Sequence, residues 1–168
     1  MDTTTFYAAA SALCFTLLGF WWVVVQFRHV ELTSDRASRR FIFLVSLHFI
    51  VPGVVSLASL LATGPMWRLA FGLAGVTGIV AAIAGTRAGS NALVAGVRGG
   101  ALLAIPIYAV ITAVALAPDV VRTSLGLEPL QVEGLLLLVI LVIGILLAWY
   151  LFTGTQPHPS EVDAPSDR

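Results

Sequence analysis

Lysine is absent from this 168-residue sequence, and charged residues of all kinds are scarce, at 11% of the chain. A soluble globular domain carries about 25% charged residues, whereas here 58% of the residues are hydrophobic. The nine basic residues, all of them arginine, balance nine acidic ones. The shortage of charge indicates that lipid is the solvent for most of the chain. The lack of a basic excess argues against a nucleic-acid partner, whose phosphates call for a concentrated basic patch.

Cysteine is nearly absent as well, because Cys14 is the only one in the sequence. A single thiol cannot form an internal disulfide, a CxxC redox pair or a zinc site built on several thiolates. We expect Cys14 to be a small packing residue inside the first apolar run. The sequence predicts no metal site and no bound cofactor.

Long polar stretches are missing between the apolar runs, which predicts an all-α, polytopic integral membrane protein. At about 1.5 Å rise per residue, each of five runs is long enough to cross a hydrocarbon core of roughly 30 Å. The polar, proline-rich residues 154–168 are expected to be a disordered cytoplasmic tail. Residues 1–153 are expected to form a five-transmembrane-helix bundle in the cell membrane, with spans at about 6–27, 41–62, 66–85, 100–117 and 134–152.

The arginines are distributed unevenly among the predicted loops. Arg36, Arg39 and Arg40 lie between the first two spans, and Arg87 and Arg98 lie between the third and fourth. Because cytoplasmic loops carry an excess of basic residues, these loops are placed in the cytoplasm. The N terminus is then outside and the C terminus inside.

Groups for intramembrane catalysis are also lacking, since every Asp and Glu falls in a predicted loop or in the tail. No His and carboxylate cluster is therefore expected for a catalytic metal. Ser56 and Ser59 share a helix with His48 but lie about 12 and 16 Å from it along the axis, too far for proton transfer. Haem held by two histidines is excluded because His29 lies at the interface and His48 about 10 Å deeper. A haem on one histidine stays open, and we predict a protein that is not an enzyme.

His48 is the only ionisable residue placed well inside a predicted span, and Pro52 follows it by one helical turn. Histidine changes charge within the physiological pH range, so it can gate a path or relay protons. Under that hypothesis His48, Pro52 and Ser59 line a water-filled path. Under the alternative, His48 is a neutral hydrogen-bonding residue that ties two helices together.

A second proline, Pro106, is expected to bend the fourth span, because it has no backbone N–H to donate. Tyr108 and Thr112 follow it and would supply hydroxyls near the bend. We interpret this segment either as a polar site or as a kink used only for packing.

Small residues recur at spacings of three and four in the third span and let helices approach closely. The pattern predicts that this helix is the most buried of the bundle, and it would also suit an oligomer interface or a pore wall. The evenly aliphatic fifth span is expected to face lipid at the rim of the bundle. The small residues of the third span are Gly72, Gly75, Gly78 and Ala82.

Two function hypotheses follow. The first is a subunit of an oligomeric channel or small transporter, with a pH-sensitive histidine in its second helix. The second is a scaffold or accessory subunit that packs against a larger membrane complex. Either way the expected partners are the lipid bilayer and a second copy or a larger membrane complex.

Overall fold

The computed structural model describes residues 2–32, 36–62, 64–87 and 92–154. Five long helices in these ranges are long and apolar enough to cross a membrane, so the fold is compatible with a multi-pass membrane protein. Within the described ranges no strand is present. The predicted tail lies almost wholly outside them. The long helices are α1 (Thr3–Phe27), α3 (Arg36–Leu61), α4 (Met66–Thr86), α5 (Ala92–Leu116) and α7 (Pro129–Gly154), with the short α2 (His29–Leu32) and α6 (Pro118–Leu125) between them.

The described helices extend beyond the predicted membrane spans. Helix α5 begins at Ala92, two turns before residue 100, and its candidate membrane span, Arg98–Leu116, lies close to the predicted 100–117. The loop before the last span contains α6, which starts with Pro118 and ends at Gly126 in the left-handed conformation, φ 65°. Helix α7 begins at Pro129, before the predicted residue 134.

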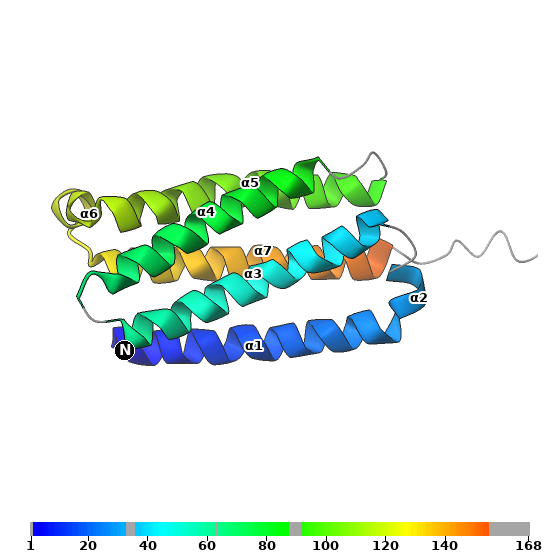
Figure 1. The fold of residues 1–168 in the computed structure, drawn as a ribbon, viewed down its shortest axis with the longest axis horizontal. Coiled ribbons are helices and arrows are strands. Elements are labelled where there is room, and N and C mark those ends of the chain that lie inside the picture. Colours follow the sequence, from blue (N-terminus) through cyan, green and yellow to red (C-terminus); the bar gives the residue numbers. More distant parts are fainter. Residues whose placement is uncertain (1, 33–35, 63, 88–91, 155–168) are drawn as a thin grey trace, which may run out of the picture.

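Helices α3 and α7 lie between α1 on one side and the α4–α5 pair on the other (Figure 1). Helix α1 packs mainly against α3, and α4 mainly against α5. In α3, 61% of the most apolar stretch is buried, against 33% in α4, so the prediction that the third span is the most buried was wrong. Helix α7, which was expected at the rim, contacts α1, α3 and α5.

Large apolar side chains cover the outside of this bundle. Phe20, Leu73 and Leu102 are 65%, 69% and 61% exposed. Such a surface is a liability in water, but it matches the hydrocarbon of a bilayer. The exposed apolar residues therefore support the assignment of the five long helices as candidate membrane spans.

The bundle has two polar ends, which we call the Asp2 end and the Arg28 end after residues at the two ends of α1. At the Asp2 end, the Asp2 carboxylate accepts a hydrogen bond from the Thr5 backbone N–H at 2.6 Å, and this bond lowers the pKa of Asp2. The α3–α4 connection and α6 lie at the same end (Figure 1). The Arg28 end holds the start of α3 and the end of α7 (Figure 1).

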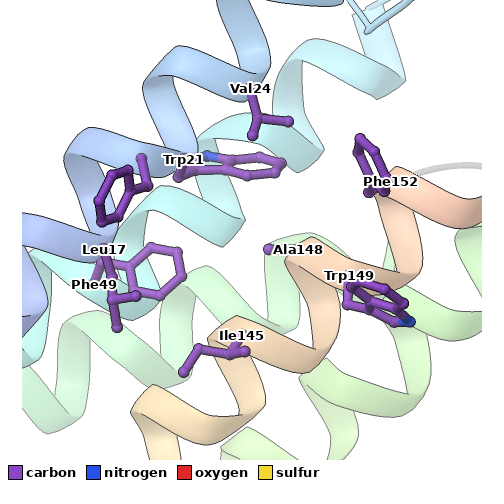
Figure 2. A pocket seen from close by; sticks show the side chains of 9 residues that line it. Leu17, Trp21, Val24, Phe49, Ile145, Ala148, Trp149 and Phe152 are labelled. Atoms are coloured by element: carbon purple, nitrogen blue, oxygen red, sulfur yellow. The ribbon is translucent and has the colours of Figure 1, made fainter.

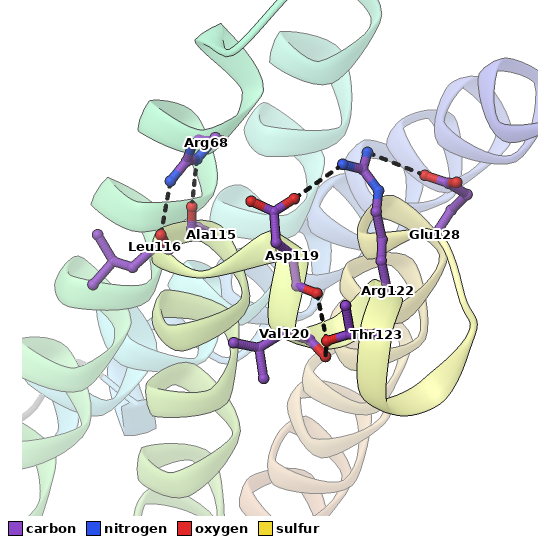
Figure 3. A network of polar contacts seen from close by, with 8 residues as sticks. All are labelled: Arg68, Ala115, Leu116, Asp119, Val120, Arg122, Thr123 and Glu128. Atoms are coloured by element: carbon purple, nitrogen blue, oxygen red, sulfur yellow. Dashed lines mark hydrogen bonds and ion pairs between the residues drawn. The ribbon is translucent and has the colours of Figure 1, made fainter.

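Arginines tie the elements together at the Asp2 end (Figure 3). Arg68 on α4 donates to the carbonyl oxygens of Ala115 and Leu116, at 2.8 and 2.7 Å. These carbonyls end α5 and have no donor within their own helix, so Arg68 caps its neighbour. Arg122 on α6 forms ion pairs of 3.4 Å with Asp119 and Glu128, both of which are exposed.

Candidate functional site

Glu133 is the acid that the sequence reasoning missed. Its side chain is 0% exposed, and it lies in the second turn of α7. Neither carboxylate oxygen has a hydrogen-bond partner among the residues the structure describes. A carboxylate buried without a partner is strongly disfavoured, so this group has to hold a proton or meet a cation. The statement that every acid falls in a loop or tail was therefore wrong.

The early start of α7 places Glu133 inside the bundle. Pro129 occupies the first helical position, where its missing N–H costs nothing. The preceding Glu128 carbonyl accepts from the N–H of Gln131 at 2.9 Å. Because the helix is already formed at Glu133, the side chain points in a direction fixed by helical geometry. It shares its stripe with Leu137 and Ile140, at spacings of four and three, and both are buried.

Helix α1 closes over Glu133 at the Asp2 end. The Tyr7 hydroxyl donates to the Leu130 carbonyl oxygen at 2.6 Å, one turn before Glu133. Tyr7 is close enough to Glu133 for an electrostatic interaction. The Phe6 ring of α1 packs against Gly134, the residue after Glu133. A Cβ added to Gly134 would come within 2.6 Å of this ring. The α1–α7 contact thus seals the carboxyl from one flank.

A small cavity of about 170 Å³ opens beside this contact. It is lined by Asp2, Thr3 and Phe6 of α1 and by Leu130, Gln131 and Leu135 of α7. Its α7 residues lie on both sides of Glu133 in the sequence. Glu133 itself does not line this cavity.

His48, the predicted site residue, is also buried, at 8% exposure. Its ring Nδ1 lies 2.8 Å from the carbonyl oxygen of Leu44. Because a carbonyl can only accept, Nδ1 carries the proton in this geometry, and Nε2 presents a lone pair when the ring is neutral. Nε2 is buried and has no hydrogen-bond partner in the described part of the chain. A second proton can therefore be bound only at Nε2.

The residues predicted to accompany His48 take different positions. Pro52 is fully buried, and its ring nitrogen cannot donate to the carbonyl of His48, four residues earlier. Ser59 is half-buried and donates within its own helix, to the Ser56 carbonyl at 2.7 Å. Ser56 itself is fully buried, and its hydroxyl has no partner among the described residues. Helix α3 therefore carries a second buried polar group, Ser56, besides His48.

The buried polar groups are spread along the bundle axis. His48 lies at the closest approach of α3 and α7, where a Cβ added to Gly144 would come within 2.7 Å of the His48 Cβ. Helices α3 and α7 run in opposite directions (Figure 1). Along α3, Ser56 lies about 12 Å from His48 toward the Asp2 end. Along α7, Glu133 lies about 16 Å from Gly144, the residue that faces His48, in the same direction. Ser56 thus lies between Glu133 and His48 in depth, nearer to Glu133, and His48 lies closer to the Arg28 end.

The residues of the second predicted site, around Pro106, take different positions on α5. Pro106 lies on the exposed face of α5, and Leu102, whose carbonyl it leaves without a donor, is 61% exposed. Thr112 donates within α5, to the Tyr108 carbonyl at 2.9 Å. Tyr108 is buried against Gly78 of α4. Tyr108 and Thr112 thus lie at the α4–α5 contact, whereas Pro106 faces away from it.

The small residues of α4 are divided between two environments. Gly75 packs against Thr112, with the Tyr108 carbonyl 2.9 Å from where its Cβ would stand, and Gly78 packs against the Tyr108 ring. Ala82 is buried in the apolar core that also contains Tyr108. Gly72 has no atom of another helix within 4 Å of its missing Cβ. Most of the predicted small face is therefore covered by α5 of the same chain.

No group of three or more His, Cys, Asp or Glu residues comes together to hold a metal ion in the described ranges. The candidate site is therefore two separate titratable groups, Glu133 and His48, with Ser56 between them in depth. Comparison with protein families, curated proteins and solved structures finds no match for this chain in any of the three.

Proposed function

We propose that this chain is a non-enzymatic, multi-pass protein of the cell membrane that moves protons through its helix bundle, as a subunit of an oligomeric channel or small transporter. The observation that carries the proposal is the buried, unpartnered carboxyl of Glu133. Ionisable groups inside candidate membrane spans are costly, and where they occur they mark ion paths and proton relays. Glu133 would be the proton-binding site near the Asp2 end.

His48 extends the proposed path toward the Arg28 end. Its Nε2 is buried and has no hydrogen-bond partner among the described residues, so it can accept a proton and release it again. The two groups are too far apart for direct transfer. Ser56, whose buried hydroxyl can both donate and accept, lies between them in depth and would connect them through water.

The scaffold alternative loses one of its supports in this fold. It relied on the glycine-rich helix as the surface that meets a larger complex, but Gly75 and Gly78 already pack against α5. A structural role for Glu133 is also unattractive, because an unpaired buried carboxyl lowers stability. Transport accounts for a group that packing does not explain.

We further propose that the Asp2 end faces outside and the Arg28 end faces the cytoplasm. Arg39, Arg40 and Arg87 lie exposed at the Arg28 end. The Asp2 end carries Asp2, Asp119 and Glu128 beside Arg68 and Arg122. This asymmetry is the one that sets orientation in membranes.

Proton flux into proteoliposomes, driven by a potassium-diffusion potential, tests the transport proposal. We expect flux above that of empty liposomes for the wild type, and flux at the empty-liposome level for Glu133→Gln, which keeps the shape and removes the titration. His48→Ala should lose the difference in flux between two pH values. Glu128→Gln is the matched control, because this nearby acid is 66% exposed, and it should behave as wild type.

Two results would contradict the proposal. Unchanged flux in Glu133→Gln would remove the carboxyl from the path. Absence of flux in the wild type, across proton and several other ion gradients, would favour the accessory-subunit hypothesis instead.

A further inference from the structure

An apolar groove of about 340 Å³ separates α1 from α7 in the half of the bundle nearest the Arg28 end. Figure 2 shows Trp21 and Phe49 on one side of it, with Ile145 and Ala148 on the other. Trp21 is only 4% exposed and is held by a hydrogen bond from its indole N–H to the Ser46 hydroxyl at 3.1 Å. The small side chain of Ala148 leaves the space open. This groove is independent of Glu133 and His48.

The groove follows one stripe of α1. Leu17, Trp21 and Val24 line it at spacings of four and three, and Arg28 continues the same stripe one turn later. From Leu17 to Arg28 the stripe is about 16 Å long at the usual helical rise. One leaflet of a bilayer has a hydrocarbon depth of about 15 Å, half of the roughly 30 Å core. The apolar lining itself, from Leu17 to Val24, is about 10 Å long at that rise, so the groove fits within one leaflet and takes the part of a lipid chain nearest the Arg28 end.

Positive charge stands at the mouth of the groove. Arg28 donates to the carbonyl oxygen of Phe152 at 2.8 Å, and its guanidinium lies 5.5 Å from the centre of the Phe152 ring. Phe152 itself lines the groove. Arg39 and Arg40 are exposed at the start of α3, which lies at the same end of the bundle. A guanidinium fixed in this position brings a positive charge to the mouth of the groove, where it attracts a phosphate.

We propose that the groove between α1 and α7 is a binding site for an anionic glycerophospholipid, with one acyl chain between Trp21 and Ala148 and the phosphate at Arg28. The apolar lining selects a hydrocarbon chain, and the arginines select negative charge. The length of the groove and the positive charge at its mouth favour a lipid over a helix from a second copy, because such a helix would continue past one leaflet.

Quenching of tryptophan fluorescence by lipids with brominated acyl chains tests the site. A variant that keeps Trp21 alone, with Trp22, Trp67 and Trp149 changed to Phe, reports contact at the groove. In mixed bilayers we expect brominated phosphatidylglycerol to bind at Trp21 with about five-fold preference over brominated phosphatidylcholine, the effect of one arginine near a membrane surface. Arg28→Gln should abolish the preference, and Arg28→Lys should keep part of it. Ala148→Leu should reduce quenching by both lipids.

The matched control keeps Trp22 alone. Trp22 neighbours Trp21 but is 49% exposed and does not line the groove, so both lipids should quench it equally. Equal quenching of Trp21 by the two lipids would overturn the proposal. Quenching of Trp22 but not Trp21, together with dimers in native mass spectrometry, would show that a second copy occupies the groove. Protection of the buried Cys14 thiol verifies that each variant is folded.

Discussion

Glu133 shows how much a single residue can say when burial and hydrogen bonding are considered together. Both of its oxygens are buried, and no described residue donates to them. The Tyr7 hydroxyl, on the helix that packs against this part of α7, donates to the Leu130 carbonyl instead. The bundle therefore contains an acid whose desolvation is not offset by its surroundings.

Removing this acid is expected to stabilise the protein. Glu133→Met replaces the carboxyl by an apolar group of similar shape, so the unfolding free energy should rise by about 1–3 kcal/mol. The measurement is the thermal midpoint in detergent, reported by a thiol-reactive dye at Cys14, which is 1% exposed and reacts when the bundle opens.

The exposed Glu128→Gln is the control and should leave the midpoint unchanged. A lower midpoint for Glu133→Met would contradict the conclusion that the buried Glu133 carboxyl lacks a stabilising partner. A higher midpoint together with normal proton flux would agree with the burial of Glu133 but refute its proposed role in proton transport.

At the scale of the helices, the sequence was sufficient to predict that five long apolar helices exist. It was not sufficient to predict which helix lies at the centre. Helices α3 and α4 both carry apolar residues on all sides, because the lipid-facing surface and the buried surface have the same chemistry. The ranking by small residues failed for this reason: Gly75 and Gly78 serve a close contact with α5 alone, whereas α3 is covered by several neighbours.

Helix α7 explains why Glu133 was missed. The apolar run begins at Gly134, but the helix begins at Pro129, because proline favours the first helical position regardless of hydropathy. The signal was present in the spacing: Glu133 continues the stripe of Leu137, Ile140 and Gly144, at intervals of four, three and four. His48, by contrast, was found because it lies in the middle of an apolar run.

The α4–α5 contact gives a prediction with an internal control. Gly78→Leu places a large side chain against the Tyr108 ring and should lower the unfolding free energy by about 3 kcal/mol or more, since overpacking displaces fixed neighbours. Gly72→Leu, on the same helix, has open space and should be tolerated. Both variants can be compared by thermal midpoint and by gel filtration in detergent. Equal behaviour of the two would contradict the packing of α4 on α5.

At the scale of the whole molecule, the two ends of the bundle differ in charge. The Arg28 end carries Arg28, Arg39, Arg40, Arg87 and Arg98, whereas the Asp2 end carries Arg68 and Arg122, which are engaged with carbonyls and carboxylates. Since arginines resist transfer across the membrane, this difference bears on orientation as well as on lipid binding.

The proposed orientation can be tested by labelling engineered cysteines in intact cells with a membrane-impermeant maleimide. In a Cys14→Ser background, Asp119→Cys should react from outside, because this side chain is 88% exposed at the Asp2 end. Arg87→Cys, exposed at the Arg28 end, should react only after permeabilisation. Helix α5 alone separates the two positions along the described chain. The reversed pattern would overturn the orientation and keep the topology, whereas reaction of both in intact cells would mean that α5 does not cross the membrane.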